Sequence, residues 1–578
     1  MQPATLSSAV PSLSNPLNLN EAASDASRPP IDVARRPRSP RVFAFWLALW
    51  LAIVGNLALW RDLERLGVDS VAFAGTFVIV LAALTALMLL TAWGRWMKPV
   101  WIAILIAAGV AQHFMMTYGV VMDTAMLANT AQTDPREVRD LLGWAFFANV
   151  LLVVALPALV IAVVPVRRTP WWPQVWRNAA LFAIAIAVAL AASFAMFSRL
   201  APLVRNHMHL RYIVNPIAGF SSAVSVALRP LLEKRKALVP ITAGAALGPS
   251  HASTRKPPLV VVVVGETARA DHFSLNGYPR DTNPELARTG VLSFRNVRSC
   301  GTDTRDSLPC MLSPLAKTAF DKRNAEHENL LDLLHAVGLA VLWVDNQSGC
   351  KEVCARVPTA YTSDLPPAEA ARFCSGGECV DDALLVGLDE RVARLPADRR
   401  RNGTVLFLHQ MGSHGPAYFK RSPPERKVFV PECTNTSLGQ CKPEELVNAY
   451  DNTIVETDHV LAATIAWLKG HAADHETALV YMSDHGESLG ELGIFLHGLP
   501  YAFAPEAQTH IPFIAWIGDA LAAERGIDRA CLRGRLDVPY SHDNLYHTVL
   551  GLVDVTTPTY DPSLDAFLPC RKQATTTP

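Results

Sequence analysis

The first third of the chain alternates between long apolar runs and short polar connections. The apolar runs cover about residues 42–60, 71–93, 99–118, 145–165 and 178–198. Each is close to the roughly 20 residues with which an α-helix crosses the hydrocarbon core of a bilayer. Buried helices of a large soluble protein are the alternative, but residues 178–198 contain no charge, which favours a membrane span. We therefore predict a domain of five transmembrane helices over residues 42–198.

The pattern changes near residue 258, where short apolar strands begin to alternate with amphipathic helices. The predicted strands are residues 259–265, 339–345, 403–409, 478–483 and 511–517, and the helical stretches include 326–337, 380–394, 444–469 and 541–552. This alternation predicts an α/β domain over residues 258–570, with a mostly parallel sheet sandwiched by helices.

Polar segments flank these two domains. Residues 1–41 are rich in Ser, Pro, Ala and Arg without an apolar period, which is typical of a disordered tail. Residues 199–257 place Arg and His beside apolar residues and end in Gly and Pro, which predicts an interfacial helix and a linker. We expect residues 571–578 to form a second short tail.

Basic residues in the short connections predict the orientation of the spans. They are the cluster at 35–41, Arg95 and Lys98, and Arg167, Arg168 and Arg177, and all fall on one side of the predicted membrane. That side should be cytoplasmic, because positive charge is enriched in cytoplasmic loops. An odd number of spans then puts everything after residue 199 on the opposite side.

All ten cysteines lie between Cys300 and Cys570, on the side where disulfides persist. Close neighbours in sequence are Cys300 and Cys310, Cys350 and Cys354, Cys374 and Cys379, and Cys433 and Cys441, which leaves Cys531 and Cys570. We expect five disulfides. A cysteine-rich zinc site is the alternative, but the spacings do not repeat a Cys-x2-Cys pair.

Length and charge narrow the class of protein. The 578 residues exceed one ordinary domain, and 52 Lys and Arg balance 52 Asp and Glu. A chain without net positive charge lacks the electrostatic attraction that nucleic-acid binding needs, so we expect no nucleic-acid partner.

Two bare apolar strands stop at potential metal ligands. Residues 259–265 run into Glu266, and residues 478–483 run into Asp484 and His485. Ligands of open α/β sheets bind outside the carboxyl ends of the strands, so the two strand ends predict one site.

A threonine-rich turn, Cys300-Gly301-Thr302-Asp303-Thr304, lies between these strands and offers a nucleophile. A metal held by carboxylates and imidazole would activate a hydroxyl and neutralise a phosphoryl group. The spacing does not choose between Thr302 and Thr304, and either can also serve as a helix N-cap.

Three histidines near predicted strand ends extend the candidate site. They are His409, His414 and His497. As a cluster they indicate phosphate ligands or a second metal position, although a single histidine is more often structural.

Several motifs together resemble the lipid A phosphoethanolamine transferases, membrane enzymes of the alkaline phosphatase superfamily that include colistin-resistance proteins. The motifs are Gly265-Glu266-Thr267-Ala268-Arg269-Ala270-Asp271-His272, Ser299-Cys300-Gly301-Thr302, Pro309-Cys310-Met311, His409-Gln410-Met411-Gly412, His414-Gly415-Pro416-Ala417-Tyr418 and Ser483-Asp484-His485-Gly486-Glu487-Ser488-Leu489-Gly490-Glu491. The resemblance covers about residues 110–570.

This resemblance assigns roles to individual residues. It implies that Thr304 is the nucleophile, that Glu266, Thr304, Asp484 and His485 hold a catalytic zinc, and that His414 and His497 bind phosphate or a second zinc. It implies that Asn129, Thr133, Glu137, Ser348 and Lys351 contact the lipid head group. Asn129, Thr133 and Glu137 are four residues apart, so they also share one face of any short helix. The chain departs from the family at Asp303, Arg305 and Asp306, whose charges bear on the choice of acceptor.

The resemblance implies transfer of phosphoethanolamine from phosphatidylethanolamine to a lipid A phosphate, through a covalent threonine intermediate, with resistance to polymyxin as the result. We expect a monomer in the bacterial inner membrane, with its N-terminus cytoplasmic and its catalytic domain periplasmic. The alternatives are transfer to core heptose or a surface glycan, a phosphoglycerol donor, a periplasmic metal-dependent phosphodiesterase or sulfatase, and a silent scaffold.

Overall fold

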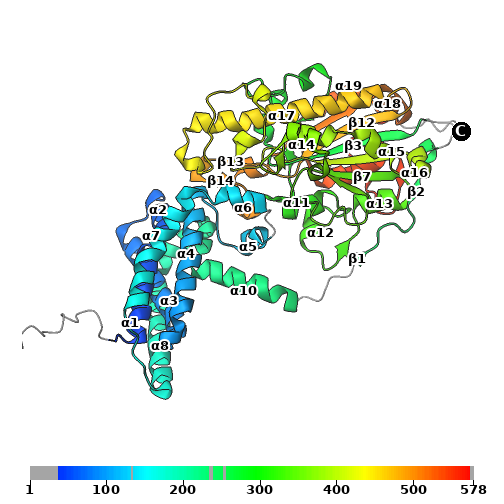
Figure 1. Ribbon diagram of the computed structural model, residues 1–578. Coiled ribbons are helices and arrows are strands. Elements are labelled where there is room, and N and C mark those ends of the chain that lie inside the picture. Colours follow the sequence, from blue (N-terminus) through cyan, green and yellow to red (C-terminus); the bar gives the residue numbers. More distant parts are fainter. Residues whose placement is uncertain (1–36, 132–134, 233–237, 252–255, 573–578) are drawn as a thin grey trace, which may run out of the picture.

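The computed structural model describes residues 37–131, 135–232, 238–251 and 256–572. It consists of a helical half, residues 37–232, and an α/β half, residues 238–572, which meet along one end of the helices (Figure 1). Most of the two predicted tails lies outside the described residues, so the domain boundaries at 41 and 571 stay predictions.

The long helices of the helical half lie where the apolar runs predict them. They are α1 (Pro40–Ile53), α2 (Leu57–Arg65), α3 (Ser70–Leu90), α4 (Lys98–Tyr118), α7 (Trp144–Val163) and α8 (Trp171–Ala195). Among the described residues, α3, α4, α7 and α8 are each long and apolar enough to cross a membrane. The pair α1–α2, bent by 40°, adds a fifth span if it is counted as one.

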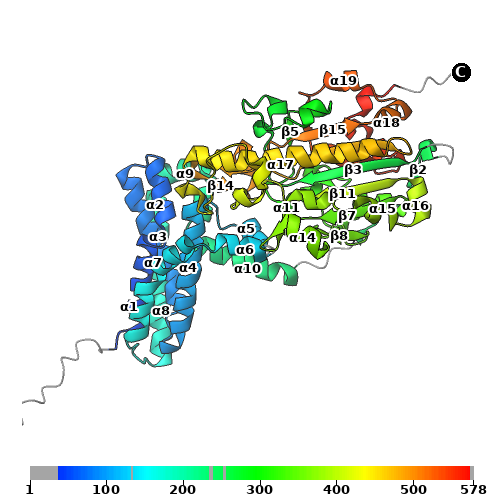
Figure 2. The same cartoon turned by 45° about the horizontal axis from the view of Figure 1, so that its top comes forward.

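Short helices fill the junction between the two halves (Figures 1 and 2). They are α5 (Thr124–Thr130), α6 (Pro135–Leu141), α9 (Phe197–Asn206), the turn η2 (Met208–Tyr212) and α10 (Ile217–Leu232). Helix α5 packs against α10, and α4 reaches the α/β half at its last turn.

A seven-stranded sheet forms the centre of the α/β half. Its order is β4 (Leu292–Phe294), β15 (Phe513–Ile517), β12 (Glu476–Ser483), β3 (Pro258–Gly265), β11 (Thr404–His409), β7 (Ala340–Asp345) and β8 (Thr359–Tyr361). From β12 to β8 the neighbours are parallel, whereas β15 runs antiparallel to both of its neighbours. The predicted mostly parallel sheet is confirmed.

Helices cover both faces of the sheet, which explains why its strands are apolar throughout. Along β3, Val261 and Val263 belong to a core with α17 (Pro443–Gly470). The alternating residues Val260, Val262 and Val264 belong to a second core with α13 (Leu330–Ala336) and α20 (Asp543–Leu552). The sheet therefore opens only at its strand ends.

Smaller elements surround this sandwich. The helices are α11 (Thr304–Met311), α12 (Lys317–Asp321), α14 (Pro367–Phe373), α15 (Leu388–Ala393), α16 (Ala397–Asn402), α18 (Asp519–Glu524) and α19 (Arg529–Arg533). The strand pairs are β1 (Leu238–Val239) with β6 (Glu326–His327), β2 (Ala246–Leu247) with β17 (Val555–Thr556), β5 (Val297–Arg298) with β16 (Tyr540–Ser541), β9 (Cys374–Ser375) with β10 (Glu378–Cys379), and β13 (Ser488–Leu489) with β14 (Phe495–Leu496).

Two predicted helices are shorter than expected. The stretch 380–394 divides into the turn η8 (Asp381–Leu385) and α15, because Gly387 between them takes a left-handed φ of 65°. The stretch 326–337 becomes a helix only from Leu330, since the Asn329 side chain caps it by accepting from the Leu331 and Asp332 amides.

All ten cysteines form disulfides, in the pairs that sequence neighbourhood predicts. The bonds are Cys300–Cys310, Cys350–Cys354, Cys374–Cys379, Cys433–Cys441 and Cys531–Cys570. The alternative of a cysteine zinc site is therefore wrong, because no thiolate is free among the described residues.

Candidate active site

The register of two central strands creates the candidate site. Strands β3 and β12 are parallel, with Gly265 opposite Ser483. The next residue on each strand is therefore a carboxylate, Glu266 or Asp484, and the two lie side by side. The Asp484 amide continues the ladder by donating to the Gly265 carbonyl at 2.9 Å. Both carboxylates are fully buried.

Four side chains converge on one point at these strand ends. The Thr304 hydroxyl donates to Glu266 Oε2 at 3.0 Å and lies 3.5 Å from His485 Nε2. The same His485 nitrogen is 3.4 Å from Glu266 Oε1 and 3.4 Å from Asp484 Oδ2. One ligand atom from each of Glu266, Asp484 and His485 lies within 4.8 Å of the other two.

Neighbouring groups orient each member of this cluster. Gln347 Nε2 donates to Glu266 Oε2 at 2.9 Å. The other Asp484 oxygen, Oδ1, accepts from two backbone amides at 3.2 and 2.8 Å. His485 Nδ1 donates to the Gly486 carbonyl at 2.9 Å, so Nε2 is the nitrogen that faces the cluster.

The electrostatics of the cluster call for a positive charge. Burial alone would lower the pKa of His485, but the Asp484 and Glu266 carboxylates raise it to about 10. Burial would raise the pKa of Glu266, yet the His485 hydrogen bond and charge hold it well below its usual range. Burial and repulsion by Glu266 raise the pKa of Asp484 to about 6.

The donor set fits a divalent cation such as zinc. Glu266 Oε1 and Asp484 Oδ2 are buried, and each faces His485 Nε2 at 3.4 Å, longer than an ordinary charged hydrogen bond. Carboxylate oxygens with an imidazole nitrogen are ligands that zinc prefers, and a cation would replace the proton that His485 otherwise carries.

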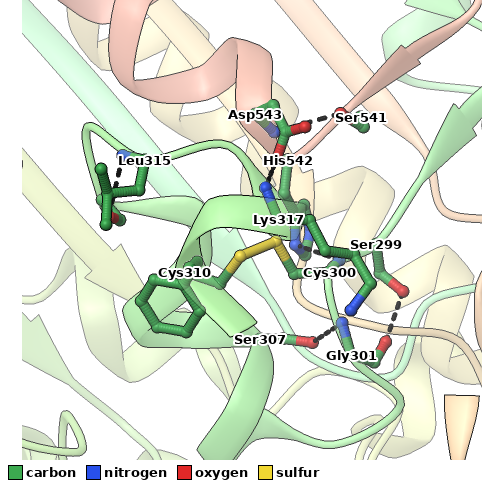
Figure 3. Close-up of a disulfide and its surroundings, with 12 residues drawn as sticks. Ser299, Cys300, Gly301, Ser307, Cys310, Leu315, Lys317, Ser541, His542 and Asp543 are labelled. Atoms are coloured by element: carbon green, nitrogen blue, oxygen red, sulfur yellow. Dashed lines mark hydrogen bonds between the residues drawn. A yellow bond between two sulfur atoms is a disulfide. The ribbon is translucent and has the colours of Figure 1, made fainter. Parts of the chain in front are cut away.

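The turn that carries Thr304 is anchored to the end of β12 through His542. Figure 3 shows His542 beside the Cys300–Cys310 disulfide of this turn. The Cys300–Cys310 disulfide ties the turn to helix α11, and the Cys300 amide donates to His542 Nδ1 at 2.9 Å. His542 Nε2 in turn donates to the Ser483 carbonyl at 2.9 Å. Because burial lowers the pKa of His542 to about 4, the ring is neutral and can accept on one nitrogen and donate on the other.

The structure brings Thr304, and not Thr302, to the carboxylates. Helix α11 begins at Thr304, and the Asp303 side chain caps it by accepting from the Asp306 amide at 2.9 Å. The Thr302 hydroxyl points elsewhere and donates to the Leu499 carbonyl at 2.6 Å.

Two of the three candidate histidines lie beside the cluster. The His497 ring centroid is 4.5 Å from that of His485 and 5.3 Å from that of His414. Burial lowers the pKa of His414 to about 3. The third histidine, His409, pairs at 3.1 Å with Asp345 at the neighbouring strand end.

The predicted head-group residues approach the site from both halves. On α5, Asn129 Nδ2 lies 4.0 Å from the position that a Cβ on Gly498 would occupy, and Gly498 directly follows His497. In the α/β half, Lys351 Nζ donates to Ser348 Oγ at 3.1 Å, in the loop that supplies Gln347. Thr133 lies outside the described residues; Glu137 belongs to α6, but its side chain also lies outside them.

Sequence reasoning missed two residues that position the site. Gln347 bonds Glu266, and Glu487 holds His497 Nδ1 at 2.8 Å while accepting from the Tyr418 hydroxyl. Glu487 stands two positions after His485, which is the one signal that pointed to it. Gln347 directly precedes Ser348, which the resemblance places at the head group, but the resemblance gives Gln347 itself no role.

Comparisons with known proteins agree with this geometry. A sulfatase model matches residues 258–555, and a model for the phosphoethanolamine transferases EptA and EptB matches residues 80–231. The chain is 40% identical to phosphatidylethanolamine transferase Mcr-1 of Escherichia coli, over 90% of this chain and 96% of that protein. It is 36% identical to phosphoethanolamine transferase EptA of Salmonella typhimurium, over 92% of this chain and 96% of that protein.

A solved structure resembles both halves together. It is the integral membrane lipooligosaccharide phosphoethanolamine transferase A of Neisseria meningitidis, with a TM-score of 0.87 and 31% sequence identity. The match covers 93% of this chain and 100% of that one.

Proposed function

Because the chain belongs to the lipid A phosphoethanolamine transferase family of the alkaline phosphatase superfamily, we propose that it transfers phosphoethanolamine from phosphatidylethanolamine to a phosphate of lipid A. The observation that carries the proposal is the Thr304 hydroxyl, which donates to Glu266 at 3.0 Å at the start of helix α11. The membrane-spanning helices fit this reaction, because both substrates are lipids.

In the first half-reaction, Thr304 Oγ1 forms a bond to the phosphorus of phosphatidylethanolamine. The bond from phosphorus to the glycerol oxygen breaks, and diacylglycerol leaves with the proton that the threonine gives up. Glu266 Oε2 already accepts the hydrogen bond of that hydroxyl. The product is a phosphoethanolamine-threonine, so the reaction follows a ping-pong scheme.

In the second half-reaction, a phosphate oxygen of lipid A attacks the same phosphorus and the bond from phosphorus to Thr304 Oγ1 breaks. The proton that the lipid A phosphate gives up restores the threonine hydroxyl. The start of α11 favours the negative charge of the phosphoryl group in both steps. His414 and His497 stand beside Thr304's partners, where they would bind phosphoryl oxygens or a second cation. Phosphoryl transfer needs mainly such positioning and charge neutralisation.

We assign the metal of the site as zinc, held by Glu266, Thr304, Asp484 and His485. When bound, zinc would neutralise phosphoryl charge and lower the pKa of the threonine hydroxyl. Gln347 and the Gly486 carbonyl would keep Glu266 and His485 turned toward it.

The proposed location is the inner membrane of a Gram-negative bacterium, with the α/β half in the periplasm. The basic connections on one side of the spans and the five disulfides on the other support this orientation. Adding an ethanolamine cation to lipid A makes the cell surface less negative. Binding of cationic peptides such as polymyxin should weaken as a result.

Mass spectrometry of lipid A from a Gram-negative host tests the proposal. Expression of the unchanged protein should add a phosphoethanolamine-sized mass to lipid A, and Thr304→Ala should add none. Thr302→Ala is the matched control in the same turn; its hydroxyl bonds Leu499, so product should persist at a reduced level. Product from Thr304→Ala would refute the nucleophile, and unmodified lipid A with well-expressed, zinc-loaded protein would refute the acceptor.

A further inference from the structure

A cavity of about 560 Å³ lies between the two halves, apart from the candidate zinc ligands. Arg61 and Arg65 of α2, His113 of α4 and Asn149 of α7 line it from the helical half, and Gln440 and Phe495 line it from the α/β half. Its volume is within the range of small-molecule binding sites, which is roughly 300–1,000 Å³.

The cavity has an excess of positive charge. Among the described residues, its lining includes two arginines and no acidic residue. The Asp62 carboxylate beside the cavity is shared among three basic side chains: it lies 3.5 Å from Arg61, 4.0 Å from Arg65 and 3.7 Å from His209. Such a surface favours an anion and disfavours an ammonium group.

The two arginines have different roles in the cavity wall. Arg61 is fixed, because its guanidinium donates to the carbonyls of Met116 at 2.9 Å and Met115 at 3.2 Å in the last turn of α4. The Arg65 side chain is 52% exposed. Its guanidinium therefore has capacity for a ligand, and an arginine presents the fork geometry that suits phosphate.

The cavity lies at the membrane edge nearest the α/β half. Its residues belong to the end of α4 and the start of α7, two candidate membrane spans. On α7 the cavity is also lined by Leu152, an apolar residue that is 62% exposed. A lipid in the adjacent leaflet could place its chains along α7 and its head group beside Arg65.

The β13–β14 hairpin links one wall of the cavity to a candidate active-site residue, His497. A Cβ added to Gly493 would meet Arg65 Nη1 at 2.8 Å, so the arginine touches the turn between β13 and β14. This hairpin lies where the halves meet (Figure 1). Phe495 lines the cavity and His497 is two residues further on, a chain distance of at most about 7 Å.

We propose that this cavity binds the phosphorylated head group of the acceptor lipid, with a phosphate on Arg65. The inference rests on the proposed function, since the acceptor is there a lipid A phosphate. The donor, phosphatidylethanolamine, carries an ammonium beside its phosphate and has no net charge. In the lipid A head group, the charged groups are phosphates, so its charge is negative. The two arginines therefore distinguish acceptor from donor.

A binding experiment tests the cavity independently of activity. Full-length protein carrying Thr304→Ala is placed in phosphatidylethanolamine nanodiscs with a small proportion of either lipid A or phosphatidylglycerol, and native mass spectrometry counts retained lipid. We expect lipid A to be retained in preference to phosphatidylglycerol. Arg65→Gln should lower its retention about tenfold, as expected for loss of one charged hydrogen bond, and Arg65→Lys should restore part of it.

Arg205→Gln is the matched control, because Arg205 is exposed on α9 at the same end of the helical half and does not line the cavity (Figure 2). It should leave retention unchanged. An equal loss in Arg205→Gln, or equal retention of phosphatidylglycerol, would overturn the proposal in favour of general attraction of anionic lipids.

Kinetics separate this proposal from the proposed function. With Thr304 intact, Arg65→Gln should raise the KM for lipid A about tenfold, while release of diacylglycerol without acceptor stays within about twofold. A parallel fall in both would mean that Arg65 only supports the fold. If the unchanged protein cleaves no phosphatidylethanolamine, the proposed function fails, and the binding experiment still decides the cavity.

Discussion

The two halves of the molecule use polar groups in opposite ways. In the α/β half, Glu266, Asp484 and His485 are fully buried, and each has fixed neighbours. In the helical half, the long helices expose apolar side chains such as Leu151 and Phe194, which are 63% and 86% exposed. Among the described residues of that half, Asn129 on the short helix α5 lies near the site, next to Gly498. We infer that the sheet ends determine the chemistry and that the junction determines which lipids arrive.

The largest effect should come from breaking the metal site, through Asp484→Asn or a chelator. Either change should lower transfer about a thousandfold or more, because the site then lacks the charge that opposes the phosphoryl group. Zinc should restore activity to the chelated protein and none to the variant. Metal content and transfer rate measure both results.

Thermal unfolding gives this prediction a control. Zinc that binds only the folded state should raise the melting temperature of the α/β half in the unchanged protein but not in Asp484→Asn. Without zinc the variant should be no less stable, because removing one carboxylate relieves its repulsion with Glu266. Asp537→Asn, in an exposed pair with Arg295, should keep the zinc response. A zinc response in Asp484→Asn would contradict the ligand assignment.

The sequence predicts the sheet better than the details of the site. Every strand it predicts lies within two residues of an observed one, because a β-branched run covered on both faces has few alternatives. It also identifies Glu266 and Asp484 together, since parallel register alone makes them neighbours.

Contacts between distant segments could not be read in the same way. The spacing of the threonine turn leaves Thr302 and Thr304 equivalent. The family resemblance favours Thr304, and the direction in which α11 begins gives the physical reason. Gln347 meets Glu266 across 81 positions of chain. His409 follows an apolar strand as the candidate ligands do, yet its partner is Asp345 on the neighbouring strand.

An intermediate effect is expected for Glu487→Gln, a change one step removed from the reacting groups. Glu487 is fully buried and holds His497 Nδ1 at 2.8 Å. The glutamine amide can donate an N–H to His497 Nδ1, which would move the ring proton from Nδ1 to Nε2. His497 Nε2 would then face the site as a hydrogen-bond donor instead of an acceptor. We expect kcat to fall about 10- to 100-fold, as for other groups that orient ligands. The KM for the donor should change little.

Glu491→Gln provides the matched control for this change. Glu491 belongs to the same motif, but its side chain is 40% exposed and pairs with Arg269. Its loss should change kcat by less than about threefold, because Arg269 keeps its two hydrogen bonds to Asp271, at 3.0 and 2.8 Å. Equal losses in the two variants would show that the whole segment, and not the His497 contact, is responsible.

The smallest effect should come from Asp140→Asn at the junction itself. Asp140 of α6 pairs with Lys420 and lies 3.9 Å from Arg421, which also contacts Glu378 at 3.2 Å. The Asp140 side chain is only 8% exposed, but Arg421 keeps Glu378, so the variant should lose about 1–3 kcal/mol of stability. If the junction aligns the α/β half with the bilayer, cleavage of vesicle-borne phosphatidylethanolamine should fall about two- to fivefold. Cleavage of a water-soluble short-chain phosphatidylethanolamine should not change, because the sheet ends are intact. Equal loss with both substrates would show that the Asp140 contact supports the chemical step itself. It would contradict the inference that the two halves have separate roles.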